Sequence, residues 1–230
     1  MIRPLLRKII TPIASKWFRK SWKEYNELRF WKRKEKLEGE LSNDHYEFFY
    51  TTHFDLNKDF YESKKVLDIG CGPRGSLEWA DNTAERIGLD PLADEYLKLG
   101  AEKHSMEYTT SGSESIPFDD DYFDVVCSFN SIDHVEDLVK TIKEIKRVLK
   151  KDGLFLLITD VNHKATACEP QEFSWDVVEK FKPEFSLLKN ERFEKHENGV
   201  YQSLKNRKEY VVADDSDRYG ILSAKFIAKS

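Results

Sequence analysis

Short apolar runs alternate with stretches of helical periodicity from about residue 65 to the end of the chain. Alternation of this kind is typical of a mostly parallel sheet with helices on both faces. The predicted strands are residues 65–69, 85–89, 107–110, 123–129, 154–159, 185–192 and 221–228. The pattern therefore predicts a doubly wound, Rossmann-like α/β fold.

Helical spacing is clearest just before the fifth predicted strand. Leu138, Ile142, Ile145 and Val148 recur every three or four residues, and the pattern ends at the lysines before Gly153. A second helix is predicted over residues 175–181, where Pro183 stops it. Residues 194–218 are polar and predict no element.

The N-terminal part of the chain has a different character from the rest. Ile10, Ile13, Trp17, Tyr25 and Leu28 recur at helical spacing among many lysines and arginines, which predicts a basic amphipathic helix. Residues 1–36 hold twelve Lys and Arg against three Glu, a net charge of +9, so with −5 overall the remainder carries −14. We therefore expect a helical extension over residues 1–60 and a catalytic domain over residues 61–230.

Two interpretations of this extension stay open. It either packs on the domain as a lid or dimer element, or it is attracted to an anionic surface. A membrane surface is favoured over nucleic acid because the acidic body would repel a phosphate backbone. The oligomeric state is not predicted.

Cysteine content and the N-terminus bear on the compartment. Cys71, Cys127 and Cys168 show no metal-ligand spacing, which favours a reducing compartment. Lys and Arg interrupt the apolar residues at the N-terminus, so neither a signal peptide nor a membrane span is predicted. We expect a cytoplasmic protein that contacts the inner face of a membrane peripherally through residues 1–36.

The sharpest chemical signal is V-L-D-I-G-C-G-P-R-G at residues 66–75, where a strand enters a glycine turn. Gly70 and Gly72 allow close approach of a ligand to the backbone, and the turn is expected to lead into a helix. Asp90 stands at the tip of the next strand, at the spacing where an acid meets ribose hydroxyls. Because Gly70, Gly72 and Gly75 also satisfy the dinucleotide fingerprint, an NAD-dependent oxidoreductase remains an alternative.

Later segments narrow this choice. G-L-D-P-L, E-S-I-P-F-D-D-D-Y-F-D-V-V, S-I-D-H-V-E-D and R-V-L-K-K-D-G-L-F-L-L follow the glycine turn. In order and spacing, residues 64–160 resemble the class I S-adenosylmethionine-dependent methyltransferases, most of all the subgroup acting on small molecules, lipids and sugars. The resemblance implies S-adenosylmethionine as the cofactor and a seven-stranded, mostly parallel sheet whose last strand is antiparallel.

The resemblance also implies a set of cofactor-binding residues. Asp68, with the glycine turn, would line the methionine end, and Asp90 would bind the ribose. Pro91 and Leu92 would flank the adenine. Gly112 replaces an acid usual in the family, so Ser113 or a backbone group is expected to substitute near the adenine, and an inactive methyltransferase-like scaffold stays a further alternative. The whole set is Asp68, Gly70, Cys71, Gly72, Asp90, Pro91, Leu92, Ser113, Glu114, Asn130 and Ser131.

A hydroxyl acceptor needs its proton removed as it attacks, so a base is expected at the strand tips. The candidate catalytic residues are Asp160, His163 and His134. Asp160 and Asn162 are similar to oxygen ligands of magnesium-dependent methyltransferases, but the third acid would be Asp133, which is expected inside a helix, so no metal is predicted. The predicted reaction is methylation of a hydroxyl, or secondarily an amine, on a small-molecule acceptor, which a lipid-linked or cell-envelope glycan would fit.

Overall fold

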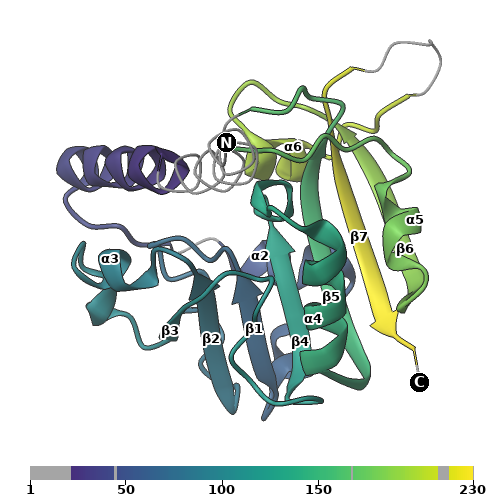
Figure 1. Cartoon of the computed structure of the whole chain (residues 1–230), viewed down its shortest axis with the longest axis horizontal. Helices are drawn as coiled ribbons and strands as arrows, with labels where there is room; N and C mark the ends of the chain where they lie inside the picture. Colours follow the sequence, from purple (N-terminus) through teal and green to yellow (C-terminus); the bar gives the residue numbers. More distant parts are fainter. Residues whose placement is uncertain (1–21, 44–45, 167, 212–217, 230) are drawn as a thin grey trace, which may run out of the picture. The chain divides into compact units, whose positions relative to one another are not determined.

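A computed structural model describes residues 22–43, 46–166, 168–211 and 218–229 (Figure 1). The chain divides into two compact units, Met1–Glu40 and Leu41–Ser230. In the first unit residues 22–38 are helical, whereas Ile10, Ile13 and Trp17 lie outside the described residues. In the described part of the chain, every helix is too short or too polar to span a bilayer. Membrane contact through residues 1–36 stays a prediction.

The second unit is built on one seven-stranded sheet in the order β3-β2-β1-β4-β5-β7-β6. Strand β7 runs antiparallel to both of its neighbours, and the pairs from β3 to β5 are parallel. This arrangement confirms the predicted fold. The strands are β1 (Lys65–Ile69), β2 (Glu85–Asp90), β3 (Glu107–Thr110), β4 (Phe123–Phe129), β5 (Leu149–Val161), β6 (Phe185–Glu194) and β7 (Gly220–Ala228).

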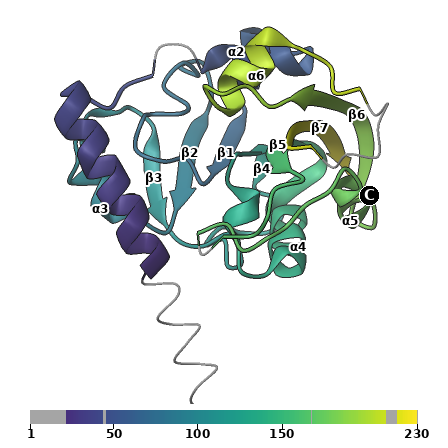
Figure 2. The ribbon, with the colours of Figure 1, turned by 90° about the horizontal axis from the view of Figure 1, so that it is seen from above.

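Helices cover both faces of the sheet (Figure 2). Successive residues of a strand point to opposite faces, so Leu67 and Val126 join one core while Val66 and Val125 join the other. The helices α4 (Leu138–Val148) and α5 (Val177–Phe181) lie on the first face, and α2 (Glu47–Tyr50) and α6 (Val200–Asn206) lie on the second. Helix α3 (Ala93–Leu97) and the short turns η1 (Thr52–Phe54), η2 (Lys58–Tyr61), η3 (Ala101–Lys103) and η4 (Ile132–His134) complete the unit.

The second unit begins at Leu41, whereas the sequence predicted a boundary after residue 60. Phe49, Tyr50, Phe54 and Tyr61 are almost fully buried and belong to the core on the second face of the sheet. Burying large aromatic side chains is worth about 2 to 3 kcal/mol each, so this segment is held to the sheet by packing. These residues are part of the second unit.

The helix expected after the glycine turn is absent, because residues 71–84 form turns. Gly72 and Gly75 have φ values of 59° and 68°, a left-handed backbone that cannot continue a right-handed helix. A Cβ on Gly75 would lie 2.6 Å from the Glu78 side chain. The carboxylate of Glu78 accepts hydrogen bonds from the backbone N–H groups of Ser105 and Met106, which fixes this loop against the start of β3.

His53 is expected to make stability depend on pH. Its buried ring lies 2.7 Å from Ser223 Oγ, and burial lowers the pKa of His53 from 6.5 to about 4. In the unfolded chain His53 is protonated below about pH 6.5, whereas in the native protein it is protonated only below about pH 4. Between pH 7.5 and 5 the free energy of unfolding should fall by about 2 kcal/mol through this residue.

Urea denaturation at both pH values, with wild type and His53→Gln, measures this effect. The variant cannot titrate at this position, so its loss of stability on acidification should be smaller by about that amount. Equal losses in the two proteins would show that His53 does not carry the pH dependence.

Candidate functional site

The turns after β1 and β4 touch each other at the carboxyl edge of the sheet. Gly70 has φ 71°, and a Cβ there would lie 2.2 Å from Ser131 Cβ. The Ser131 hydroxyl donates to the carbonyl of Ile69 at 2.6 Å and lies 2.7 Å from Ser128 Oγ. Only glycine fits at position 70, and Ser131 holds the two turns together.

Asp68 lies beneath the glycine turn and is almost fully buried. One of its carboxylate oxygens accepts hydrogen bonds from Ser76 Oγ and, at 3.0 Å, from the Tyr50 hydroxyl. Burial raises the pKa of Asp68 to about 7, although both hydrogen bonds act to lower it. A cationic or hydrogen-bonding ligand at the turn would therefore stabilise the Asp68 carboxylate.

Asp90 ends β2 beside the same turn. Its carboxylate accepts hydrogen bonds from the backbone N–H of Leu92 at 2.9 Å and of Gly72 at 3.4 Å. These bonds fix the carboxylate at the strand tip, where ligands bind in open α/β sheets. A carboxylate has acceptor capacity beyond two bonds, so it can still receive ribose hydroxyls.

Asn130 follows β4 with a left-handed backbone, φ 54°, and its N–H donates to the Ile158 carbonyl at 2.7 Å. Its side-chain Oδ1 is buried and has no hydrogen-bond partner within the described residues. A buried acceptor without a donor costs free energy, which a bound amino group would recover. With Asp68 and Asp90, this orphaned oxygen fits S-adenosylmethionine, which carries an ammonium and a ribose.

Three residues of the predicted cofactor set direct their side chains elsewhere. Cys71 packs into the core, where a Cβ on Gly88 would meet its sulfur at 2.5 Å. Ser113 Oγ lies 3.1 Å from Thr141 Oγ1 of α4, and Glu114 accepts from the N–H of Glu136 at 2.8 Å. Ser113 and Glu114 thus anchor the start of α4, and cofactor binding by them stays a prediction, as it does for Pro91 and Leu92.

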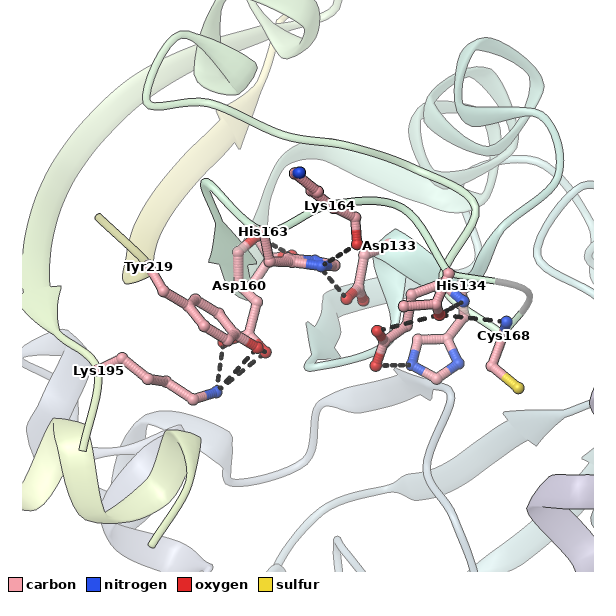
Figure 3. A network of polar contacts seen from close by, with 11 residues as sticks. Asp133, His134, Asp160, His163, Lys164, Cys168, Lys195 and Tyr219 are labelled. Carbon is pink, nitrogen blue, oxygen red and sulfur yellow. Dashed lines mark hydrogen bonds and ion pairs between the residues drawn. The ribbon is translucent and has the colours of Figure 1, made fainter. Parts of the chain in front are cut away.

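A second polar group, named here the acceptor-side network, lies at the carboxyl end of β5 and consists of Asp160, Lys195 and Tyr219 (Figure 3). Asp160 receives Lys195 Nζ on both oxygens at 2.8 and 3.0 Å and the Tyr219 hydroxyl at 2.7 Å. Asp160 itself is buried, whereas Tyr219 is 41% exposed. Burial and the bond to Asp160 raise the pKa of Tyr219, so the phenol stays protonated at neutral pH.

His163 is not presented to solvent. Its Nδ1 lies 3.1 Å from the Lys164 carbonyl, which can only accept, so Nδ1 carries a proton. Its buried Nε2 faces Asp133 Oδ2 at 3.6 Å (Figure 3). Burial, followed by the charge of Asp160, raises the pKa of Asp133 to about 6. His163 therefore forms a buried pair with Asp133 and packs at a tilt against Tyr219, with 5.4 Å between ring centroids and 34° between ring planes.

His134, the third candidate base, lies on the other side of Asp133. Its Nε2 is 3.9 Å from Glu169 Oε1, and both side chains are partly exposed. Figure 3 shows the pairs around Asp160, Asp133 and His134 side by side. The structure thus brings all three predicted catalytic residues to one edge of the sheet.

Sequence reasoning missed Lys195, Tyr219 and Glu169. The first two lie at the borders of residues 194–218, for which no element was predicted. Strand pairing explains their position, because Gly220 of β7 is level with both Val161 of β5 and Glu194 of β6. The strands predicted over residues 185–192 and 221–228 already flanked Lys195 and Tyr219. What the sequence lacked was the antiparallel register of β7 with β5 and β6, which brings both residues to Asp160.

The strand order with antiparallel β7, the glycine turn after β1 and the acid at the tip of β2 define the class I methyltransferase fold. Residues 67–157 match a family model described as a methyltransferase domain. This matched segment carries the class I S-adenosylmethionine-dependent methyltransferase motifs that the sequence analysis singled out, in agreement with the predicted family.

Curated relatives align with this central segment. The chain is 35% identical over 100 residues to the uncharacterized methyltransferase YcgJ of Bacillus subtilis, which is 41% of this chain and 40% of the relative. It is 31% identical over 121 residues to the chloroplastic tocopherol O-methyltransferase of Arabidopsis thaliana, which is 49% of this chain and 35% of the relative. The chain thus spans less than half the length of these relatives.

Solved structures share the fold. The crystal structure of YcgJ has a TM-score of 0.55 at 17% identity and covers 75% of this chain and 96% of that protein. An S-adenosylmethionine-dependent methyltransferase from Mesorhizobium loti has a TM-score of 0.53 at 14% identity, covering 73% and 92%. At these identities the likeness establishes architecture and leaves the substrate to the site itself.

Proposed function

We propose that this chain transfers a methyl group from S-adenosylmethionine to a hydroxyl group of a small-molecule or glycan acceptor. The observation that carries the proposal is the acceptor-side network, in which a buried carboxylate holds a half-exposed phenol at the carboxyl edge of the sheet. Similarity to the tocopherol O-methyltransferase of Arabidopsis thaliana also favours an oxygen acceptor.

The donor would be held by the residues of the first turn and strand tips. The Asp90 carboxylate would accept hydrogen bonds from the ribose hydroxyls, and Asn130 Oδ1 would accept one from the ammonium group. The turn at Gly70 would allow the backbone to approach the ligand closely. When bound, S-adenosylmethionine supplies a methyl group that leaves its sulfur for an attacking oxygen, while the carbon–sulfur electron pair stays on sulfur. The protein then has to position the acceptor and take up one proton.

The acceptor-side network provides a route for that proton. An acceptor hydroxyl that reaches Tyr219 can donate its proton to the phenol oxygen while the phenol proton passes to Asp160. Lys195 stabilises the Asp160 carboxylate as the resting state and keeps it oriented. The buried His163–Asp133 pair supports the Tyr219 ring from behind and acts as a positioning pair.

The NAD-dependent alternative loses its structural basis. A dinucleotide fingerprint works by placing the pyrophosphate at the N-terminus of the helix that follows the glycine turn. Residues 71–84 of this chain form turns, so that anion site is missing at the position where the fingerprint requires it. S-adenosylmethionine has no phosphate and does not need it.

The test is a panel of acceptors offered to the full chain with S-adenosylmethionine, using monosaccharides, oligosaccharides and phenols with their amino analogues. Release of S-adenosylhomocysteine, measured by mass spectrometry, should be faster with a hydroxyl compound than with its amino analogue. Faster release with the amines would contradict the acceptor class. Calorimetric binding of NAD in place of S-adenosylmethionine would contradict the whole proposal.

A further inference from the structure

Three side chains with metal-binding groups meet beside the acceptor-side network. Asp133 and His134 come from η4, and Glu169 comes from the loop between β5 and α5. One ligand atom from each lies within 4.8 Å of the other two. We propose that this Asp133–His134–Glu169 cluster binds a divalent transition-metal ion of the Zn²⁺ or Co²⁺ type.

The first argument is an unpartnered oxygen. Asp133 is only 1% exposed, and its Oδ2 faces His163. The other oxygen, Oδ1, is buried and has no hydrogen-bond partner within the described part of the chain. Burying a carboxylate oxygen without a hydrogen-bond partner raises the free energy of the folded protein, and coordination of a cation by that oxygen would lower it again.

The second argument is distance. His134 Nε2 and Glu169 Oε1 are 3.9 Å apart, which is too far for a hydrogen bond. Ligand atoms about 2.1 Å from a tetrahedral Zn²⁺ lie about 3.4 Å from one another, and roughly 4 Å apart at wider angles. The His134–Glu169 pair therefore needs to approach by only about half an ångström, and all three ligand atoms already lie within 4.8 Å of one another. Glu169 belongs to a segment without helix or strand.

The third argument is the chemistry of the donor set. Two carboxylates and one imidazole suit borderline divalent ions, and three protein ligands leave a coordination position for water or an acceptor oxygen. His163, whose Nδ1 is fixed by the Lys164 carbonyl, would orient Asp133 from behind as an outer partner. This cluster differs from the ligand set of Asp160, Asn162 and Asp133 for which no metal was predicted. Asp160 does not belong to it, because its carboxylate is paired with Lys195.

Cobalt provides a test that does not depend on catalysis. The full chain, treated with EDTA and dialysed, is titrated with Co²⁺ while its visible absorption is recorded, without S-adenosylmethionine or acceptor. Wild type should bind one Co²⁺ that Zn²⁺ displaces. His134→Gln and Glu169→Gln should each bind at least about 100-fold more weakly, because each removes one of three ligands.

Glu172→Gln is the matched control, since it removes an exposed carboxylate from the same loop and should leave Co²⁺ affinity unchanged. Melting curves without metal establish that the variants are folded, and both replaced side chains are partly exposed. Wild type that shows no Co²⁺ spectrum at millimolar metal, or equal affinity in all four proteins, overturns the proposal. The site goes beyond the proposed methyl transfer, whose own tests use neither measurement.

Discussion

Replacing Asp90 by alanine is expected to weaken S-adenosylmethionine binding by at least about 100-fold. The carboxylate at the tip of β2 would bond two ribose hydroxyls, and hydrogen bonds to a charged group are worth about 1.5 to 3 kcal/mol each. The same carboxylate also holds the backbone of Gly72 and Leu92, so its loss loosens the turn that receives the ligand. Isothermal titration calorimetry measures the affinity directly.

Two further variants separate these effects. Asp90→Asn keeps the size of the side chain and removes its charge, so it should lose affinity through the ribose while the protein stays folded. Asp94→Ala changes an exposed acid on α3 and should bind as wild type does. Unchanged affinity in both Asp90 variants would contradict the placement of the ribose.

Replacing Asp160 by asparagine should lower the turnover of methyl transfer by about 100-fold or more, with little change in S-adenosylmethionine affinity. General-base contributions are typically 10²- to 10⁴-fold, and an amide cannot take up the proton that Tyr219 passes on. The measurement is the rate of S-adenosylhomocysteine release with the best acceptor from the panel. A drop in affinity alone would assign Asp160 to donor binding instead.

Two controls distinguish proton uptake from structural support by Asp160. Tyr219→Phe keeps the ring that packs on His163 but removes the hydroxyl, so it should share the loss of turnover without a loss of stability. Asp152→Asn alters the opposite end of the same strand, where φ is 60° and asparagine is well tolerated, and should retain full activity. Full turnover in both Asp160→Asn and Tyr219→Phe would exclude the proposed proton route.

The strands were predictable because each carries its own local signal. The bounds of β1, β3 and β4 agree with prediction, and β5 differs because it begins at Leu149 instead of residue 154. Leu149 pairs with Phe123 across a register shift in β4, a long-range contact that no local pattern contains. The prediction of a helix after the glycine turn was wrong for a related reason. The side chains of Glu78 and His104 occupy the space that a Cβ on Gly75 would need, and no local pattern contains the contact with His104.

The predicted base illustrates the limit within the site. His163 stands at the right strand end, yet its Nε2 is buried against Asp133, and the exposed group beside Asp160 is Tyr219. A residue's place at a strand tip follows from the strand pattern. The direction and exposure of its side chain depend on neighbours from other parts of the chain.

The sequence by itself determined the class of fold, the glycine turn, Asp90 and the location of the candidate base at the ends of β4 and β5. These follow from periodicity and from motifs within a single stretch of chain. Only the tertiary structure decided that Lys195, Tyr219 and Glu169 complete the site. Lys195 directly follows β6, Tyr219 directly precedes β7, and Glu169 lies in a loop. The antiparallel register of β7 brings the end of β6 and the start of β7 to the end of β5.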